Sequence, residues 1–156
     1  MFDSILSLVL KPIAARKLNN GVPFARECGL KVTSFDSGIA SARMAVNPCL
    51  QDAQGAFESG ALFTLAETAS GAAMTGSFLP VIINARPVVS RADFTVISDC
   101  KGEAVADAKV EGNSRLLLAK LRKEKKVQFS VSVNVIDSGN NELVAKMKAN
   151  WHVIMK

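Results

Sequence analysis

The sequence contains few of the residues that build metal and disulfide sites. Its three cysteines are widely spaced and form no CxxC pair, and His152 is the only histidine. An odd number of scattered cysteines indicates reduced thiols, as in cytoplasmic proteins, rather than a disulfide framework. No cysteine or histidine pair has metal-ligand spacing, so we expect no metal site. The cysteines are Cys28, Cys49 and Cys100.

Long apolar runs are also missing. No segment reaches the roughly 18 uninterrupted apolar residues that a membrane span needs. The N-terminal segment has Asp3 first and its basic residues last, which is the reverse of a secretory signal. We therefore expect a cytoplasmic protein with no membrane partner.

Tyrosine is absent, and no predicted strand face carries the stacking aromatic residues that single-strand binders use. The formal charge of +5, much of it in residues 120–126 (KLRKEKK), fits an anionic partner in general. Without stacking aromatics the charge does not indicate nucleic acid, so we expect no nucleic-acid partner.

What the sequence does contain is enough for one folded domain. Its 156 residues are 49% hydrophobic and 21% charged, without repeats or linkers. Residues 1–21 are predicted as an N-terminal helical region, in which 4–19 form an amphipathic helix that Ser4 caps and Gly21 ends. Its apolar positions are Ile5, Leu8 and Val9. The pattern leaves open whether this helix covers a sheet edge or contacts a partner subunit.

Alternating apolar and polar residues predict six strands. LKVTSFD and GIASARMAV pair around a turn at Ser37-Gly38, and PFAREC before them forms one short turn. VQFSVSVNV (127–135) alternates most strictly, and DSGNN joins it to the last strand as a hairpin. One dry and one wet face per strand is typical of an antiparallel sheet covered on one side. The other strands lie within 88–97, 103–111 and 143–153.

Residues 58–78 are predicted to cover that sheet as a helix. They are too many for one strand, and alanine and leucine favour helix. Small side chains along the helix let the sheet curl closely around its axis. These are Gly60, Ala61, Ala66, Ala69, Gly71, Ala72 and Ala73. The order strand, strand, long helix and four strands predicts an α+β hotdog fold over residues 22–156, an antiparallel sheet wrapped around one central helix.

Glu67 is the only charged side chain between Ser59 and Ala85. A fully buried, unpaired carboxylate is costly, and burial raises its pKa. One interpretation is that Glu67 caps a backbone group or pairs with Arg86 or Arg91. The other is that a wet cleft reaches it and that it has a chemical function.

The start of this helix also resembles a known motif. GAFESGALFTLAETASG (55–71) is similar to the helix-start motif of hotdog acyl-CoA thioesterases of the phenylacetate-pathway type. Gly55 stands at the first glycine of that motif, Ser59-Gly60 at its glycine pair, and Glu67 at the carboxylate of its L-A-D/E tripeptide. The likeness extends over roughly residues 22–155.

The resemblance implies hydrolysis of an acyl-CoA thioester, with coenzyme A as part of the substrate and no required cofactor. Glu67 is then the general base or the nucleophile. The backbone amides of Ser59 and Gly60, at the positive end of the helix, are then the donors to the oxyanion. For Ser59 the alternative is a plain helix N-cap whose hydroxyl acts only locally.

Two positions depart from the family. Asp52 stands where the family has asparagine and Glu58 where it has histidine, so both add negative charge beside the expected entrance for substrate. Asp52 either orients water or substrate or is a turn residue. The helix carries no histidine, so hotdog dehydratase or hydratase chemistry is not expected. These departures motivate an alternative function, a hotdog protein that binds acyl-CoA or acyl groups without hydrolysing them; a purely structural dimer module is a third.

The spacing of the catalytic groups predicts an oligomer. Ser59 and Glu67 are eight residues apart, about 12 Å along a helix that rises 1.5 Å per residue. One carbonyl carbon cannot approach both within about 3 Å. We therefore expect a homodimer or homotetramer with antiparallel helices, in which the amides of one subunit face Glu67 of another.

The remaining predicted contacts concern the two parts of the substrate. The acyl pocket is expected between helix and strands, lined by Phe63, Met74 and Phe94. Ser70 either holds the attacking water or bonds back to the chain. NSRLLLAKLRKEKK (113–126) is predicted as a short helix with a solvated basic face or as a clamp for the coenzyme A phosphates. The clamp residues are Arg115, Lys120, Arg122 and Lys123.

Overall fold

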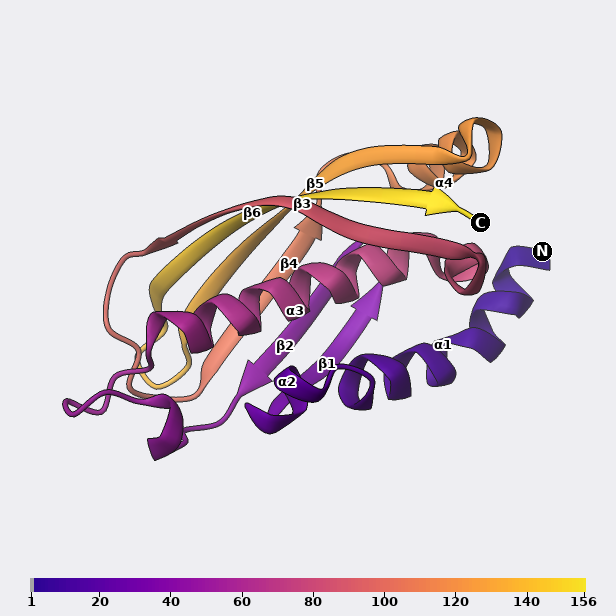
Figure 1. The fold of residues 1–156 in the computed structure, drawn as a ribbon. Helices are drawn as coiled ribbons and strands as arrows, with labels where there is room; N and C mark the ends of the chain where they lie inside the picture. The colour runs from indigo at the N-terminus through magenta and orange to yellow at the C-terminus, as the bar shows by residue number, and fades with distance from the viewer. Residues whose placement is uncertain (1) are drawn as a thin grey trace.

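Six strands form one antiparallel sheet in the spatial order β1-β2-β4-β5-β6-β3, and the sheet curves over the long helix α3 (Figure 1). This computed structural model describes residues 2–156, with side chains from Ser4 onward. The elements in chain order are α1 (Phe2–Asn20), α2 (Pro23–Glu27), β1 (Leu30–Asp36), β2 (Ile39–Met44), η1 (Pro48–Leu50), α3 (Ser59–Phe78), η2 (Leu79–Asn84), β3 (Ala85–Val96), β4 (Ala104–Val110), α4 (Ser114–Glu124), β5 (Lys126–Asp137) and β6 (Glu142–Met155).

The alternation along the strands follows the two faces of the sheet, as predicted. In β5 the valines at 127, 131, 133 and 135 are buried, whereas Gln128, Ser132 and Asn134 are exposed. The predicted hairpins are also present. Ser37 and Gly38 both have positive φ, 46° and 90°, which is the backbone of the type I′ turn favoured between antiparallel strands. The α+β hotdog fold is confirmed.

The alanines of α3 lie against the sheet, as predicted. Ala66, Ala69 and Ala72 are fully buried, and the facing alanines of β4 are buried as well. The prediction was wrong for Gly60, which is exposed, whereas Gly71 is half-buried and a Cβ there would lie 3.6 Å from the Trp151 ring of β6. The close approach falls at Gly76, where a Cβ would lie 3.2 Å from backbone atoms of β1 and its turn.

Helix α1 differs from its prediction at its start and in its buried face. It begins at Phe2, so Ser4 lies inside the helix and does not cap it. The side that packs against η2 and β1 carries Leu10 and Ala14. The predicted apolar positions are exposed instead, because they occupy the neighbouring stripe of the helix: Ile5, Leu8 and Val9. The predicted boundary between 1–21 and 22–156 stays a prediction.

The two edges of the sheet are different. At β1 the side-chain amide of Asn19, the penultimate residue of α1, bonds to the strand edge: Val32 N–H donates to Asn19 Oδ1 at 2.8 Å, and Asn19 Nδ2 donates to Val32 O at 3.5 Å. At the other edge β3 pairs only with β6, and Pro87 interrupts its row of N–H groups. Within the described part of the chain, no helix is both long and apolar enough to cross a membrane.

Candidate active site around Glu67

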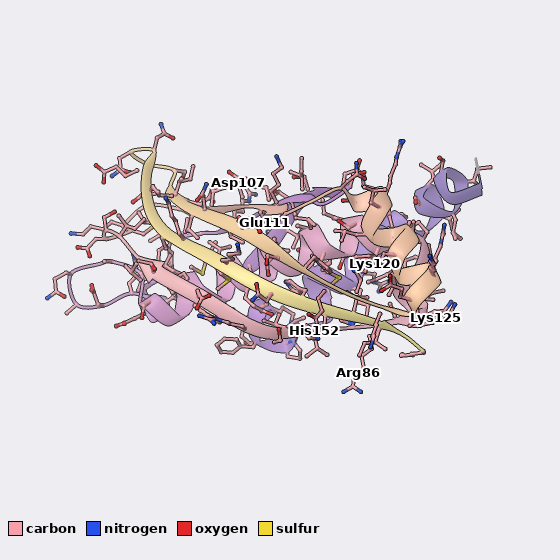
Figure 2. All side chains as sticks on the ribbon, turned by 90° about the horizontal axis from the view of Figure 1, so that it is seen from above. Arg86, Asp107, Glu111, Lys120, Lys125 and His152 are labelled. Carbon is pink, nitrogen blue, oxygen red and sulfur yellow. The ribbon has the colours of Figure 1, made fainter. Side chains whose placement is uncertain are left out.

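Glu67 lies in the third turn of α3 and is half-buried. Neither alternative that would make it a purely structural residue is present, since its carboxylate has no ion pair or hydrogen bond within residues 4–156. Arg91 binds Asp93 instead, with a guanidinium-to-carboxylate distance of 3.0 Å. Arg86 is exposed on the outer face of the sheet, away from α3 (Figure 2).

Burial raises the pKa of the Glu67 carboxyl above its ordinary value of 4.5, because desolvation disfavours the charged form. No neighbouring cation offsets this cost. A carboxylate with a raised pKa is a stronger proton acceptor once it is ionised, which is what a general base requires.

A cavity of about 380 Å³ reaches Glu67. Its walls come from α1, α3, η2 and β3, with Trp151 of β6 closing one side. Most of the lining is apolar, including the predicted Met74, and the charged lining residues are Glu67 and Lys17. The carboxylate therefore borders an apolar hollow large enough for an organic group.

The first turn of α3 holds the predicted amide donors, but its cap differs from the prediction. Glu58 is the N-cap residue and Ser59 the first helical residue, so the N-cap alternative for Ser59 was wrong. The Glu58 carbonyl accepts from the amides of Ala61 and Leu62. The amides of Ser59 and Gly60 have no partner among the described residues, and both residues are exposed. A Cβ at Gly60 would meet nothing within 4 Å, so the space in front of this turn is open.

One side of α3 connects the two features. Gly60, Phe63, Glu67 and Gly71 recur every three or four residues, and none of them is fully buried, unlike the alanines toward the sheet. This side therefore exposes the helix-start amides and the carboxylate together. Within one chain, however, they remain about 12 Å apart along the helix.

The predicted acyl-pocket residues separate into two groups. Met74 lines the cavity, whereas Phe63 and Phe94 do not. The two phenylalanines pack edge to face, with ring centroids 5.4 Å apart and an interplanar angle of 80°. They form a neighbouring aromatic pair one turn before Glu67, and their part in the acyl pocket stays a prediction.

The other predicted contacts near the helix are mostly local. Asp52 Oδ1 accepts from the amides of Gln54 and Ala56 at 2.8 and 3.0 Å, which makes Asp52 the turn residue of its loop. Ser70 is fully buried, donates to the Glu67 carbonyl at 2.8 Å and accepts from Trp151 Nε1 at 3.3 Å. Glu58 is exposed, and its side chain makes no capping bond.

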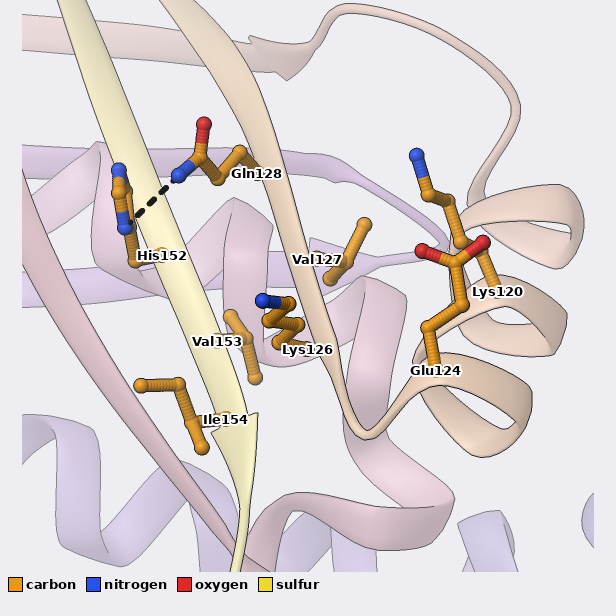
Figure 3. A pocket seen from close by; sticks show the side chains of 8 residues that line it. All are labelled: Lys120, Glu124, Lys126, Val127, Gln128, His152, Val153 and Ile154. Atoms are coloured by element: carbon orange, nitrogen blue, oxygen red, sulfur yellow. Dashed lines mark hydrogen bonds between the residues drawn. The ribbon is translucent and has the colours of Figure 1, made fainter.

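The basic residues of α4 do not converge on one point. Arg115 borders a small hollow between α1 and the β1–β2 turn. Lys120 borders a different hollow of about 410 Å³ on the outer face of the sheet, shown in Figure 3. There it stands across from His152, whose Nδ1 lies 3.2 Å from Gln128 Nε2. Arg122 and Lys123 are exposed near the end of α4. The predicted four-residue clamp is therefore not assembled within one protomer.

Residues 11–153 match the family described as a domain of unknown function (DUF4442). The chain belongs to the DUF4442 family. No curated protein matches its sequence.

Solved structures share the fold of this DUF4442 protein. A probable thioesterase of unknown function from Pseudomonas aeruginosa aligns with a TM-score of 0.80 and 23% identity, over 94% of this chain and 96% of that chain. The E. coli PaaI protein, from the phenylacetic acid degradation operon, gives 0.73 and 18%, over 97% and 95%. A variant of the phenylacetic acid degradation protein PaaI from Thermus thermophilus gives 0.65 and 20%, over 86% and 100%. At these identities the similarity shows the hotdog fold.

Sequence reasoning missed how much α1 contributes to the cavity of the DUF4442 protein. Leu10, Ile13, Lys17 and Leu18 all line it. The stripe through Leu10 and Leu18 is apolar, but so is the adjacent stripe through Leu8, so the sequence indicates neither which stripe is buried nor which neighbour it meets. Trp151 carried no signal beyond its inward position on the last strand.

Proposed function

We propose that this protein hydrolyses acyl-CoA thioesters, with Glu67 as general base or nucleophile and without a cofactor. The observation that carries the proposal is the Glu67 carboxyl itself: unpaired, half-buried in an apolar helix and bordering a cavity of about 380 Å³. Fold similarity to a probable thioesterase agrees with thioester hydrolysis in general.

In the base-catalysed version, the Glu67 carboxylate takes a proton from a water molecule while the water oxygen attacks the thioester carbonyl carbon. The carbonyl oxygen becomes an oxyanion, which the amides of Ser59 and Gly60 bind. The carbon–sulfur bond then breaks, and the departing thiolate of coenzyme A takes up the proton. The products are a carboxylic acid and free coenzyme A.

This mechanism needs two copies of the chain. Ser59 and Glu67 lie about 12 Å apart along one helix, so the amides that face a given Glu67 come from a second α3 running antiparallel to the first. The exposed side of α3 and the free edge of β3 are the surfaces of the protomer compatible with such a pairing. We therefore propose a homodimer at minimum, with two sites related by the twofold axis.

The acyl group is proposed to occupy the cavity. An apolar cavity of about 150 Å³ already accommodates benzene, and this cavity is more than twice as large. The nucleotide end of coenzyme A then lies outside, toward solvent. Lys120 and Lys123 lie one turn apart on α4 and remain the proposed phosphate contacts there.

A second candidate function, acyl-CoA binding without hydrolysis, is favoured by one observation. The exposed Glu58 carboxyl stands at the N-cap, directly before the two free amides. A negative charge there opposes the oxyanion that those amides are proposed to stabilise.

The test is release of free thiol from acyl-CoA substrates of increasing chain length, by wild type, Glu67→Gln and Glu67→Ala. Glu142→Gln, an exposed glutamate of β6, is the matched control. We expect turnover by wild type and the control, and a loss of at least about 100-fold in both Glu67 variants. Acyl-CoA binding without turnover at any chain length establishes the second function. Full activity in Glu67→Ala contradicts the first.

A further inference from the structure

Helix α1 exposes a stripe of large apolar side chains. Ile5, Leu8, Val9 and Ile13 are 61%, 76%, 59% and 59% exposed and recur every three or four residues, so they share one side of the helix. The buried stripe through Leu10 lies beside them. The first half of α1 is therefore apolar on most of its circumference, which is unusual for a helix in contact with water.

This stripe continues to the mouth of the Glu67 cavity. Ile13 lines the cavity together with Val22 and Ile83, which are 53% and 64% exposed, and Phe24 follows at 66%. We call these residues the α1 patch: Ile5, Leu8, Val9, Ile13, Val22, Phe24 and Ile83. The patch holds seven of the fifteen exposed large hydrophobic residues within the described chain. Isolated exposed apolar residues are normal, but such a concentration marks an interaction surface.

The charges at the patch are positive. Arg16 and Lys17 follow Ile13 by one turn, are exposed, and have no ion-pair partner within residues 4–156. The other cations nearby already face an acid, Lys11 facing Asp36 and Arg26 facing Glu27, each at 3.5 Å. Among the described side chains of α1, the uncompensated charges beside the apolar stripe are therefore the cations Arg16 and Lys17, while the unpaired Glu67 carboxylate lies half-buried in the cavity wall on α3.

We propose that the α1 patch docks on the surface of an anionic lipid bilayer. The apolar stripe enters the interface between headgroups and acyl chains, and Arg16 and Lys17 lie against the anionic headgroups. A helix lying in the interface needs no membrane span, but the proposal departs from the sequence-based expectation of no membrane partner. A second copy of the chain is the competing occupant, and the oligomeric state of a patch variant distinguishes it from the bilayer.

Docking in this way turns the mouth of the Glu67 cavity toward the lipid, because Ile13, Val22 and Ile83 belong to both. This orientation of the cavity mouth, together with the proposed function on which this step rests, places entry and exit of the acyl group at the membrane surface. The released fatty acid then leaves into the bilayer and does not have to cross water.

The test is cosedimentation of the full chain with phosphatidylglycerol–phosphatidylcholine vesicles and with pure phosphatidylcholine vesicles. We expect binding to the anionic vesicles, weakened by salt, and much weaker binding to the neutral ones. Leu8→Ser/Val9→Ser should lower the partition coefficient by roughly tenfold or more, and Arg16→Gln by about fivefold. Leu116→Ser, equally exposed on α4, is the matched control and should change nothing.

Three outcomes overturn the proposal. Equal binding to both vesicle types, or unchanged binding by Leu8→Ser/Val9→Ser, contradicts docking through this patch. Conversion of a dimer to a monomer by the same double variant, measured by light scattering, assigns the patch to a contact between copies. Thiol release from a soluble short-chain acyl-CoA without vesicles separates the two proposals, since the double variant should keep it. If vesicle binding is intact but the protein releases no thiol, the result contradicts the proposed thioester hydrolysis and leaves the membrane docking standing.

Discussion

Glu67 is a side chain that the fold tolerates at a cost. Its carboxyl is desolvated without compensation, so its pKa in the folded protein is above the ordinary 4.5. Between 4.5 and that raised value the folded chain binds more protons than the unfolded chain. Stability therefore falls as pH rises through this window and stays lower above it.

Glu67→Gln should consequently be more stable than wild type at neutral pH, and the two should converge below about pH 4.5. Urea unfolding across this pH range measures the difference. The same substitution should remove the rise of kcat/KM with pH that ionisation of Glu67 produces in wild type. An identical pH dependence of stability in both proteins would show that the carboxyl is not desolvated.

Asp137 is the opposite case of a buried carboxyl. Burial alone would raise the pKa of Asp137. The hydrogen bonds from the amides of Gly102, Gly139 and Lys101 and from the Cys100 thiol outweigh burial, so the pKa lies below the ordinary 3.8. The amide bonds measure 2.8 to 2.9 Å. Burial, with the Asp137 charge as a second cause, raises the pKa of Cys100 to about 12, so this thiol stays protonated.

We expect Asp137→Ala to lower the free energy of unfolding by about 2 kcal/mol or more, because it leaves three amides without their acceptor. The contribution is present above the unfolded-state pKa of about 3.9 and is lost as pH falls through the lowered folded pKa. The gap between wild type and Asp137→Ala in urea unfolding should therefore narrow in acid. If the difference in unfolding free energy between the two proteins does not change with pH, the destabilisation comes from lost packing and not from the Asp137 charge.

Helix α3 combines two kinds of glycine. Gly76 faces backbone atoms at 3.2 Å, whereas the space beside Gly60 is empty. The distinction is not visible in the sequence, where both glycines read as small residues of one apolar helix. It depends on which side of the helix the β1–β2 turn crosses.

Gly76→Ala should therefore lower stability by about 1–3 kcal/mol, whereas Gly60→Ala should raise it by at most about 1 kcal/mol. Activity should fall more in Gly60→Ala than in Gly76→Ala. The methyl group of Gly60→Ala stands where the carbonyl approaches, and we expect kcat/KM to fall at least about tenfold. Thermal unfolding and thiol release measure the two effects. A kcat/KM of Gly60→Ala equal to that of wild type would show that the Ser59 and Gly60 amides do not bind the substrate carbonyl.

Strands and helices were predictable from the sequence where the pattern is local. Period-two alternation specified the faces of β4, β5 and β6, and the length of 58–78 specified a helix. The buried face of α1 was not predictable, because its adjacent stripes through Leu8 and Leu10 are equally apolar. The separation of Phe63 from Met74 was also hidden, since it depends on where α1 and η2 meet α3.

The assembled protein can be tested for shared sites. If each site combines Glu67 of one chain with Gly60 of another, then Glu67→Ala and Gly60→Leu should each be inactive alone. Mixed and refolded together at equal amounts, they should recover roughly a quarter of wild-type activity, since half the dimers are mixed and each mixed dimer has one intact site. No recovery, with mixed dimers shown by mass, would place both groups in one chain.

The amide of Asn19 on the edge of β1 has a consequence for growth of the sheet. It mimics the peptide group of a neighbouring strand and satisfies Val32 from within the same chain. An incoming strand therefore finds β1 blocked at Val32, whereas β3 offers the longer unpaired edge. Strand addition is accordingly expected at β3 rather than at β1, and two molecules that pair there leave neither β3 edge open to a third.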